Sequence, residues 1–537
     1  MRYNQKSFNC VLFVRRSRVL ALLLLCLAWL DVRVPPAVDA RGLNHIGTQK
    51  QLFVDDSIIL TTSHVMRVLN RVVKSPNNPI IKADRPWETS YLRCNKVFYD
   101  EKDGLFKMWY GVWPEFKATK DVAGGYRNNW TEKGDGFARE EVPDPYNFDF
   151  GDDSNRRLCY ATSRDGFNWE KPNLGMVEFQ GSRNNNILPA GTPSPNILDT
   201  HEKDPSRRYK AVARDFKTTG YHYGQINLFY SPDGIEWRPA PENREFDIAG
   251  KKTRWGPSTL LGWDSIKGVY AIHIESCRHR GCPMAQRVLG RSESPDMIHW
   301  SEVETIMVPD ERDPPDLEFY ACPTFIYEDL YIGMTWIFRT TDAVHYPQLS
   351  FSRDGLNYER PFREPLMNLG DSGDFDETQL LCETPLFHDG RIWFYYSGGN
   401  FRAPEQFLER GDKAVHAIGV ATLPEDGFVS YLAGKLRPGK VLTRVLTFEG
   451  SQLSVVMMAA QHNYGAGPVQ VKVEILDSTF EPIPGFTLEE ADNLATTGKH
   501  RVSWKGKSDV GELAGKPIQL RFTLRNAKLN SFQFLQE

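Results

Sequence analysis

The chain has no excess of charge of either sign. Its 537 residues include 65 Lys and Arg against 69 Asp and Glu, a formal net charge of −4 at pH 7. A dedicated nucleic-acid binder usually carries a basic excess, so nucleic acid is not expected as a partner. Hydrophobic residues make up 40% of the chain and aromatic residues 12%, which is enough for a core and excludes global disorder.

Long hydrophobic runs are also missing. The most apolar stretch, Val19–Leu30, has 12 residues, whereas a membrane-spanning helix needs about 20. Arg15, Arg16 and Arg18 precede this run, and Val38 and Ala40 offer small residues for cleavage. This pattern predicts a signal peptide over residues 1–40 and an exported protein, periplasmic or extracellular, with no stable membrane span afterwards. The alternative is that the run stays as an uncleaved anchor.

Cysteine is scarce, and no metal motif occurs. Beyond the signal, six cysteines remain at positions 94, 159, 277, 282, 322 and 382. They are too scattered for a disulfide-stapled scaffold, although Cys277 and Cys282 are close enough to pair across a loop. Neither C-x-x-C nor H-E-x-x-H appears, so no structural zinc is expected. We expect no cofactor, and the metal ligands are unknown; a structural calcium stays open because no run of ligands identifies it.

Glycine and proline, by contrast, are abundant, with 42 and 34 residues, as is typical of a turn-rich β protein. A heptapeptide of the type Ser-Arg-Asp-Gly-Phe-Asn-Trp organises the middle of the chain. In each copy the Asp-Gly pair predicts a tight turn between two strands. The copies are Ser163–Trp169, Ser231–Trp237, Ser294–Trp300 and Ser352–Tyr358, with a degraded fifth at Pro424–Phe428.

Two more β-rich segments precede each turn, as Lys96–Tyr99 and Phe106–Gly111 do in the first unit. Four strands in each of five units predict an all-β protein with a five-bladed β-propeller over residues 41–433. An open array of β-sheets is the alternative. We expect a strand near Gln51–Leu60 to complete the last blade.

The pattern changes near Gly434. Alternating apolar runs follow at Val469–Leu476, His500–Trp504 and Ile518–Leu524. They predict a small antiparallel β-sandwich over residues 434–537 as an accessory domain. Packing against the propeller is its expected role, with carbohydrate binding as the alternative.

The propeller predicts where a functional site lies. Residues that begin the first strand of a blade, or end the second, face one mouth of an axial funnel, and Arg93 and Arg402 are among them. We expect catalytic carboxylates here, with Glu318 and Glu377 favoured because aromatic neighbours could raise their pKa. The full catalytic set is Glu318, Glu377, Glu88, Asp215 and Glu275. The substrate-binding set is Trp113, Arg214, His273, Arg278, Trp336, Arg339 and Asp376.

These residue types fit a carbohydrate. Aromatic faces stack on sugar rings, two carboxylates can supply the acid and the base or nucleophile of glycoside cleavage, and arginine forks favour carboxylate or sulfate substituents. For each carboxylate the alternative is a solvated turn residue. His273 could instead be a satisfied core histidine.

The layout resembles the five-bladed β-propeller glycosidases, a superfamily that includes glycoside hydrolase families 32 and 43. The resemblance covers residues 50–430 and rests on the repeated heptapeptide, the Trp87-Glu88 and Phe106–Gly111 segments, and Phe394–Gly399. Family 32 has Arg-Asp-Pro and Glu-Cys-Pro segments, which Arg214-Asp-Phe216 and Glu275-Ser-Cys277 match in part.

The resemblance implies a secreted glycoside hydrolase that acts on an oligosaccharide or polysaccharide, with an acid, a base or nucleophile, and a third carboxylate in the funnel. An anionic substrate would suit the arginines. It also implies a carbohydrate substrate as partner and an exported protein that takes part in polysaccharide degradation by aquatic bacteria. The alternatives are a non-catalytic carbohydrate-binding propeller and a protein-interaction propeller.

Overall fold

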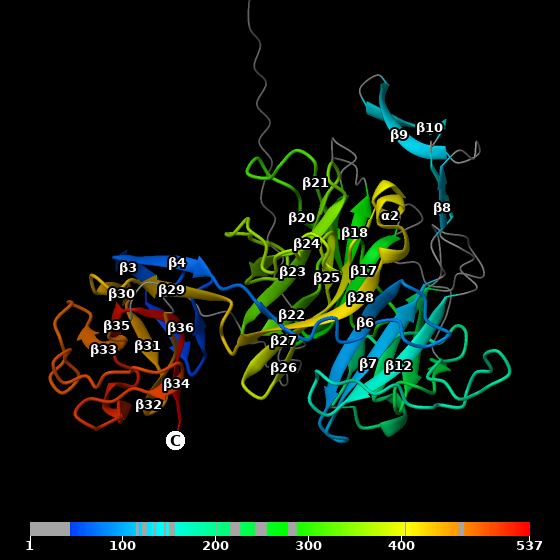
Figure 1. Cartoon of the computed structure of the whole chain (residues 1–537). Coiled ribbons are helices and arrows are strands. Elements are labelled where there is room, and N and C mark those ends of the chain that lie inside the picture. Colours follow the sequence, from blue (N-terminus) through cyan, green and yellow to red (C-terminus); the bar gives the residue numbers. More distant parts are fainter. Residues whose placement is uncertain are drawn as a thin grey trace, which may run out of the picture. The chain divides into compact units, whose positions relative to one another are not determined.

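The structure is a computed structural model of the whole chain (Figure 1). The predicted signal peptide lies outside the described residues, as do Asp215 and Arg278. The structure describes residues 43–113, 117–120, 126–133, 136–143, 146–149, 156–200, 202–214, 226–241, 255–277, 287–402, 404–460 and 467–536.

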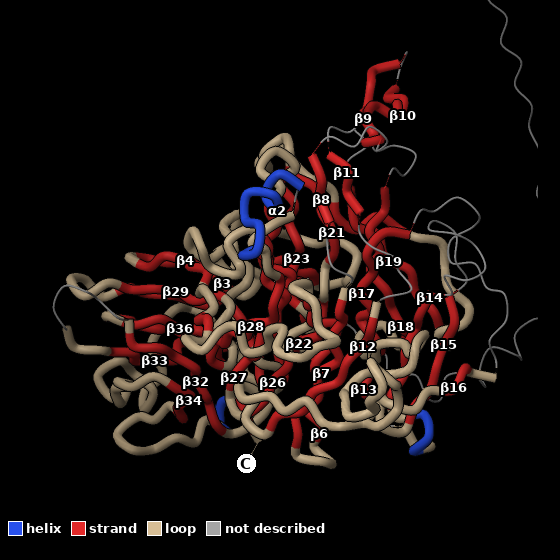
Figure 2. The backbone as a smooth tube through the Cα atoms, turned by 45° about the vertical axis from the view of Figure 1, so that its right-hand side comes forward, coloured by secondary structure: helices blue, strands red, loops and turns tan. Residues whose placement is uncertain are grey.

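Nearly all regular structure is β, as the sequence predicts. In the described part of the chain the one α-helix is α2 (Pro404–Arg410), and the regular structure in Figure 2 is almost all strand, drawn in red. None of the helices described there is long and apolar enough to cross a bilayer.

The repeats form antiparallel sheets in chain order. The first has the order β12-β7-β6, and the next two are four-stranded. Their strands are β6 (Leu92–Asp100), β7 (Leu105–Val112) and β12 (Arg157–Ser163); β13 (Ile197–Leu198), β14 (Tyr209–Arg214), β15 (Ile226–Ser231) and β16 (Arg238–Pro239); and β17 (Trp255–Asp264), β18 (Val269–Cys277), β19 (Arg287–Ser294) and β20 (Glu304–Met307).

The fourth and fifth repeats share a nine-stranded sheet, in which a single parallel pair, His345 with Gln379, joins two groups. The first group is β21 (Leu317–Ala321), β22 (Thr324–Tyr327), β23 (Leu330–Arg339) and β24 (Val344–Ser352). The second is β25 (Gln379–Cys382), β26 (Leu386–His388), β27 (Arg391–Gly399), β28 (His416–Pro424) and β5 (Val73–Lys74). Two further hairpins pair β8 (Lys117–Lys120) with β11 (Tyr146–Asp149) and β9 (Tyr126–Lys133) with β10 (Gly136–Pro143).

The repeated turn does more than reverse the chain. In the second copy the Ser231 hydroxyl accepts a hydrogen bond from the Gly234 amide. The Asp233 carboxylate accepts hydrogen bonds from the amides of the two residues after the glycine. Gly234 has φ +80°, and a Cβ there would lie 2.4 Å from Trp109 in the preceding sheet. The Gly234 carbonyl also accepts the Trp109 indole N–H at 2.8 Å. The turn therefore docks one sheet onto its neighbour.

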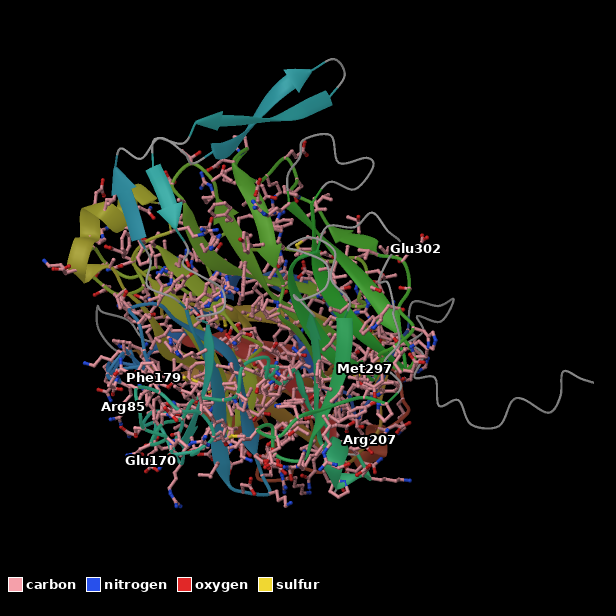
Figure 3. All side chains as sticks on the ribbon, turned by 90° about the vertical axis from the view of Figure 1, so that its right-hand side faces the viewer. Arg85, Glu170, Phe179, Arg207, Met297 and Glu302 are labelled. Carbon is pink, nitrogen blue, oxygen red and sulfur yellow. The ribbon has the colours of Figure 1, made fainter. Side chains whose placement is uncertain are left out.

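The same contact joins the first sheet to the last. In the first copy the Gly166 carbonyl accepts the hydroxyl of Tyr395, which lies on β27. The Cys94 amide of β6 also donates to the Ser397 hydroxyl at 2.9 Å. In the third copy Met297, labelled in Figure 3, takes the glycine position with φ +65°. Its side chain is buried, and that burial offsets the backbone strain.

The C-terminal region pairs with N-terminal strands. Two six-stranded sheets share one core of aliphatic and aromatic side chains, and in Figure 1 blue strands lie beside orange ones within them. One sheet holds β1 (Asn44–Gly47), β31 (Leu446–Phe448), β35 (Ile518–Arg525), β30 (Gly439–Thr443), β3 (Ile59–Ser63) and β33 (Gln470–Asp477). The other holds β34 (Gly498–Arg501), β32 (Gln452–Ala459), β36 (Ala527–Leu535), β29 (Val429–Ala433), β4 (Val65–Leu69) and β2 (Gln51–Leu52).

This pairing corrects one expectation. The segment Gln51–Leu60 does not complete the last repeat, because β2 pairs with β36 and β3 pairs with β30. The strand that pairs with β28 is instead β5. The two C-terminal sheets therefore also contain residues 44–69 and 429–433, which the sequence grouped with the repeats.

Candidate functional site

The first strands of the repeats are bent at mid-length. Register shifts lie at Cys94/Lys96 in β6, Leu260/Gly262 in β17 and Phe319/Ala321 in β21. The matching strand of the fifth repeat is broken outright, since β25 ends at Cys382 and β26 begins at Leu386. A bulge leaves extra backbone unpaired and re-aims side chains, a feature common near active sites.

Hydrogen bonds between repeats lie near these bends. The Trp336 indole donates to the Cys382 carbonyl at 2.8 Å, and the Thr259 hydroxyl donates to the Cys322 carbonyl at 2.9 Å. With the bond from Cys94 to Ser397, these contacts bring the bent strands of several repeats together.

Glu383 lies in the break between β25 and β26, beside this convergence. Its side chain is half-buried. Burial raises the pKa of Glu383 to about 7, against the opposing effect of the positive charges of Lys96 and Arg93. Within the described residues its carboxylate has no hydrogen-bond partner. Burial likewise lowers the pKa of Lys96, and the nearby carboxyl group of Glu383 opposes that shift. A carboxyl group that is partly protonated near neutral pH can give or take a proton during catalysis.

A cavity of about 750 Å³ begins beside Arg93, within the size range of small-molecule sites. Arg93, Asn95 and Trp113 line one part of it, and the loop after Ile187 lines another. The Trp113 ring stacks on Tyr91 at 5.4 Å, and the Arg156 guanidinium lies 3.5 Å from the Trp113 ring centre. Trp113 therefore lines the cavity, as expected of a binding residue, but its ring already contacts protein groups.

Glu318 lies on the accessible face of β21. The strand alternates buried and half-buried residues, so Glu318 and Tyr320 point to the same side. Glu318 forms an ion pair with Arg287 of β19, and Tyr320 accepts a hydrogen bond from Arg402 at 3.4 Å.

Three other predicted carboxylates are held by structural contacts. Glu88 accepts hydrogen bonds from Tyr110 and Lys171 and from the backbone amides of Asp84 and Arg85. Such a saturated carboxylate stabilises its loop and is poorly placed to exchange a proton.

The Glu377 carboxylate accepts hydrogen bonds from the Arg410 guanidinium and from the Gly373 amide, each at 2.7 Å. The Asp376 carboxylate accepts hydrogen bonds from the Lys74 ammonium at 2.7 Å and from the Tyr396 hydroxyl at 2.9 Å. Asp376 therefore links β5 to β27.

The remaining predicted residues are dispersed. His273 is 1% exposed, and burial lowers its pKa to about 3. Its Nδ1 lies 3.3 Å from the Cys322 carbonyl, but its Nε2 has no hydrogen-bond partner among the described residues, so it is a core histidine that is only half satisfied. Trp336 is buried and supports β25, and Arg339 pairs with Asp316 at 2.7 Å. Only the backbones of Arg214 and Glu275 are described, near the ends of β14 and β18.

The sequence analysis missed Glu383 and Lys96 because it searched only the ends of strands. A signal was present. Glu383 is the one acidic residue in the apolar run Leu380–Phe387, and an isolated acid in such a run is usually buried or functional. No group of three or more His, Cys, Asp or Glu side chains in the described residues could hold a metal ion.

No protein-family profile matches the chain, and no curated protein is similar to it in sequence. Solved structures do resemble it. A glycosyl hydrolase from Bacteroides ovatus is 14% identical and covers 66% of this chain and 94% of its own, with a TM-score of 0.40. A β-1,2-mannobiose phosphorylase from Listeria innocua is 12% identical over 66% of this chain and 97% of its own, with a TM-score of 0.36.

An N-acetylgalactosamine deacetylase from F. plautii is 14% identical over 72% of this chain and 96% of its own, with a TM-score of 0.34. A likeness at this level assigns neither activity nor substrate to this chain.

Proposed function

We propose that the repeats form a five-bladed β-propeller, and that the two C-terminal sheets form a β-sandwich beside it. Two contacts support the ring. The turn at Gly234 docks the second sheet onto the first, and the turn at Gly166 docks the first sheet onto β27 of the last repeat. In a closed ring of blades the first and last must touch in this way.

We propose further that the protein is an exported glycoside hydrolase with Glu383 as its general acid. The observation that carries this proposal is the state of Glu383: a half-buried carboxyl group with a pKa of about 7 and no hydrogen-bond partner within the described residues. It is close enough to Arg93 to feel its charge, and Arg93 lines the cavity. A protonated carboxyl group there can protonate the oxygen of the leaving sugar. Export rests on the apolar run at Val19–Leu30.

Glycoside cleavage needs a second carboxylate, as base or nucleophile. Glu318 is the described candidate, although it is paired with Arg287. Asp215 follows β14 in the sequence, and Glu275 lies near the end of β18; we propose them as the other candidates. The chemistry uses side chains alone, and the proposal includes no cofactor.

The test is hydrolysis of a panel of polysaccharides by the mature protein, measured as release of reducing ends. Glu383→Gln keeps the shape of the side chain but removes its proton transfer, and we expect kcat to fall about 10²- to 10⁴-fold. Glu364→Gln, at an exposed residue, is the matched control and should act as wild type. Full activity in Glu383→Gln would refute the assignment.

A non-catalytic carbohydrate-binding propeller is the second candidate. It is favoured by the ion pairs at Glu318 and Glu377, because they leave Glu383 as the one unpaired carboxylate identified at the site among the described residues. Retention on a glycan array without product release from any substrate of the panel would support this second function.

A further inference from the structure

Three arginines from separate repeats lie close enough to one buried histidine for their charges to act on it. His345 lies on β24 and is 1% exposed, and neither of its ring nitrogens has a hydrogen-bond partner among the described residues. The charges of Arg402, Arg93 and Arg287 all reach it and, with burial as the larger cause, hold its pKa well below the usual value. His345 is therefore neutral and keeps one N–H donor and one acceptor.

Two of these arginines and the histidine share an aromatic wall. The His345 ring lies 4.5 Å from the ring of Phe338 and 4.9 Å from that of Tyr320. The Arg287 guanidinium lies 5.1 Å from the Tyr320 ring centre, and that of Arg402 lies 5.7 Å from the Phe338 ring centre. The same two rings thus fix the positions of all three side chains.

The positive charge of this cluster is not neutralised. Among the described residues, Glu318 pairs with Arg287, while Arg93 and Arg402 have no carboxylate partner. Even with Glu383, partly protonated at neutral pH, acting on Arg93, the three arginines leave an excess of positive charge around a neutral, unpartnered histidine among the described residues. Clustered like charges and buried polar groups without partners are both unfavourable, so their presence points to a group that binds there.

We propose that Arg402, Arg287, Arg93 and His345 form a subsite for the acidic substituent, a carboxylate or a sulfate, of a saccharide. Guanidinium groups bind both anions through paired N–H donors. Carboxylate and sulfate share this recognition because each presents two or more anionic oxygens. The inference rests on the proposed function, because it names the substrate class of that same site. It predicts that binding depends on the acid group of the sugar more than on its ring.

Affinity electrophoresis of the mature protein tests this subsite. The gels contain polygalacturonate or alginate as carboxylate polymers, ι-carrageenan or dextran sulfate as sulfated polymers, and dextran as the neutral polymer. We expect retardation by at least one acidic polymer and none by dextran. The two acidic classes distinguish a carboxylate ligand from a sulfate ligand.

Arg402→Gln should raise the dissociation constant at least tenfold. Arg402→Lys should recover part of this affinity, because it restores the positive charge but not the paired N–H donors of the guanidinium group. Arg164→Gln removes one charge from an exposed turn residue and should bind as wild type. Circular dichroism checks that each variant is folded. Equal losses in Arg402→Gln and Arg164→Gln, equal retardation by dextran, or no retardation by any acidic polymer would overturn the subsite.

The two proposals fail separately. Glu383→Gln should still be retarded by the acidic polymer while it no longer releases reducing ends. Binding to acidic polymers without hydrolysis in wild type would remove the hydrolase and leave the subsite. Hydrolysis of neutral substrates without binding to acidic polymers would remove the subsite and leave the hydrolase.

Discussion

Replacing Tyr331 by phenylalanine should weaken a buried contact that joins two repeats. Tyr331 begins the second strand of the fourth repeat, and its hydroxyl donates to both oxygens of Asp264 at 2.8 and 2.7 Å. Asp264 ends the first strand of the third repeat and also binds Arg291, and both of these side chains are fully buried. The variant leaves a buried carboxylate with one donor fewer.

A hydrogen bond to a charged group contributes about 1.5–3 kcal/mol, so Tyr331→Phe should lower the free energy of unfolding by about that amount. The assay is urea unfolding followed by tryptophan fluorescence, with thermal unfolding as a second measure. Tyr99→Phe makes the same chemical change at a half-buried hydroxyl that has no partner among the described residues, and it should change stability by less than about 0.5 kcal/mol. Equal effects in the two variants would refute the view that this bond joins the repeats.

Three further predictions follow from the same structure. Because the proposed acid is the protonated form of Glu383, whose pKa is raised to about 7, kcat/KM should fall as pH rises above about 7. This fall should be absent from the residual activity of Glu383→Gln. The pKa of Asp100 is lowered below 3.8 mainly by Arg208 and Lys107, against desolvation, so its stabilisation is present above about pH 4 and lost as pH falls. Asp100→Asn should cost about 3–5 kcal/mol at pH 7 and less in acid, as measured by urea unfolding. Gly234→Ala should destabilise by about 1–3 kcal/mol in the same assay, because its Cβ would meet Trp109 at 2.4 Å. Gly175→Ala has a similar φ with nothing within 4 Å and isolates the backbone strain; equal costs in the two alanine variants would contradict a docking role for the turn.

The repeated turns could be predicted from sequence because they are local. The Ser-x-Asp-Gly signature encodes its own hydrogen bonds: the Asp165 carboxylate accepts the amides of Phe167 and Asn168, which helps hold its pKa near 2. These bonds join residues two or three positions apart. No distant partner is needed, and the sequence placed all four turns correctly.

The assignment of the N-terminal strands failed for the opposite reason. Residues 44–69 contain short strands that are mostly exposed or half-buried, and nothing local says which sheet they join. The structure pairs β4 with β29 and β3 with β30, and these pairs link residues 360 to 384 positions apart. Long-range strand pairing depends on complementary buried faces, here the common core of the two six-stranded sheets.

The candidate site divides in the same way. The sequence could assign Glu318, Arg93 and Arg402 to positions near strand ends, because strand ends can be read from turns; that they line one funnel stays a prediction. It could not say that Glu88 and Asp376 are saturated by donors from Lys171 and Lys74, since these donors come from other segments.

By itself, then, the sequence determined the β character, the repeats and their turns, because those features depend on periodicity and on neighbours a few residues apart. Only the tertiary structure decided that Glu383 lies half-buried near Lys96 and Arg93, and that the charges of three arginines act on His345. Both outcomes depend on desolvation and on charges contributed by distant strands, and neither property belongs to any residue until the chain has folded.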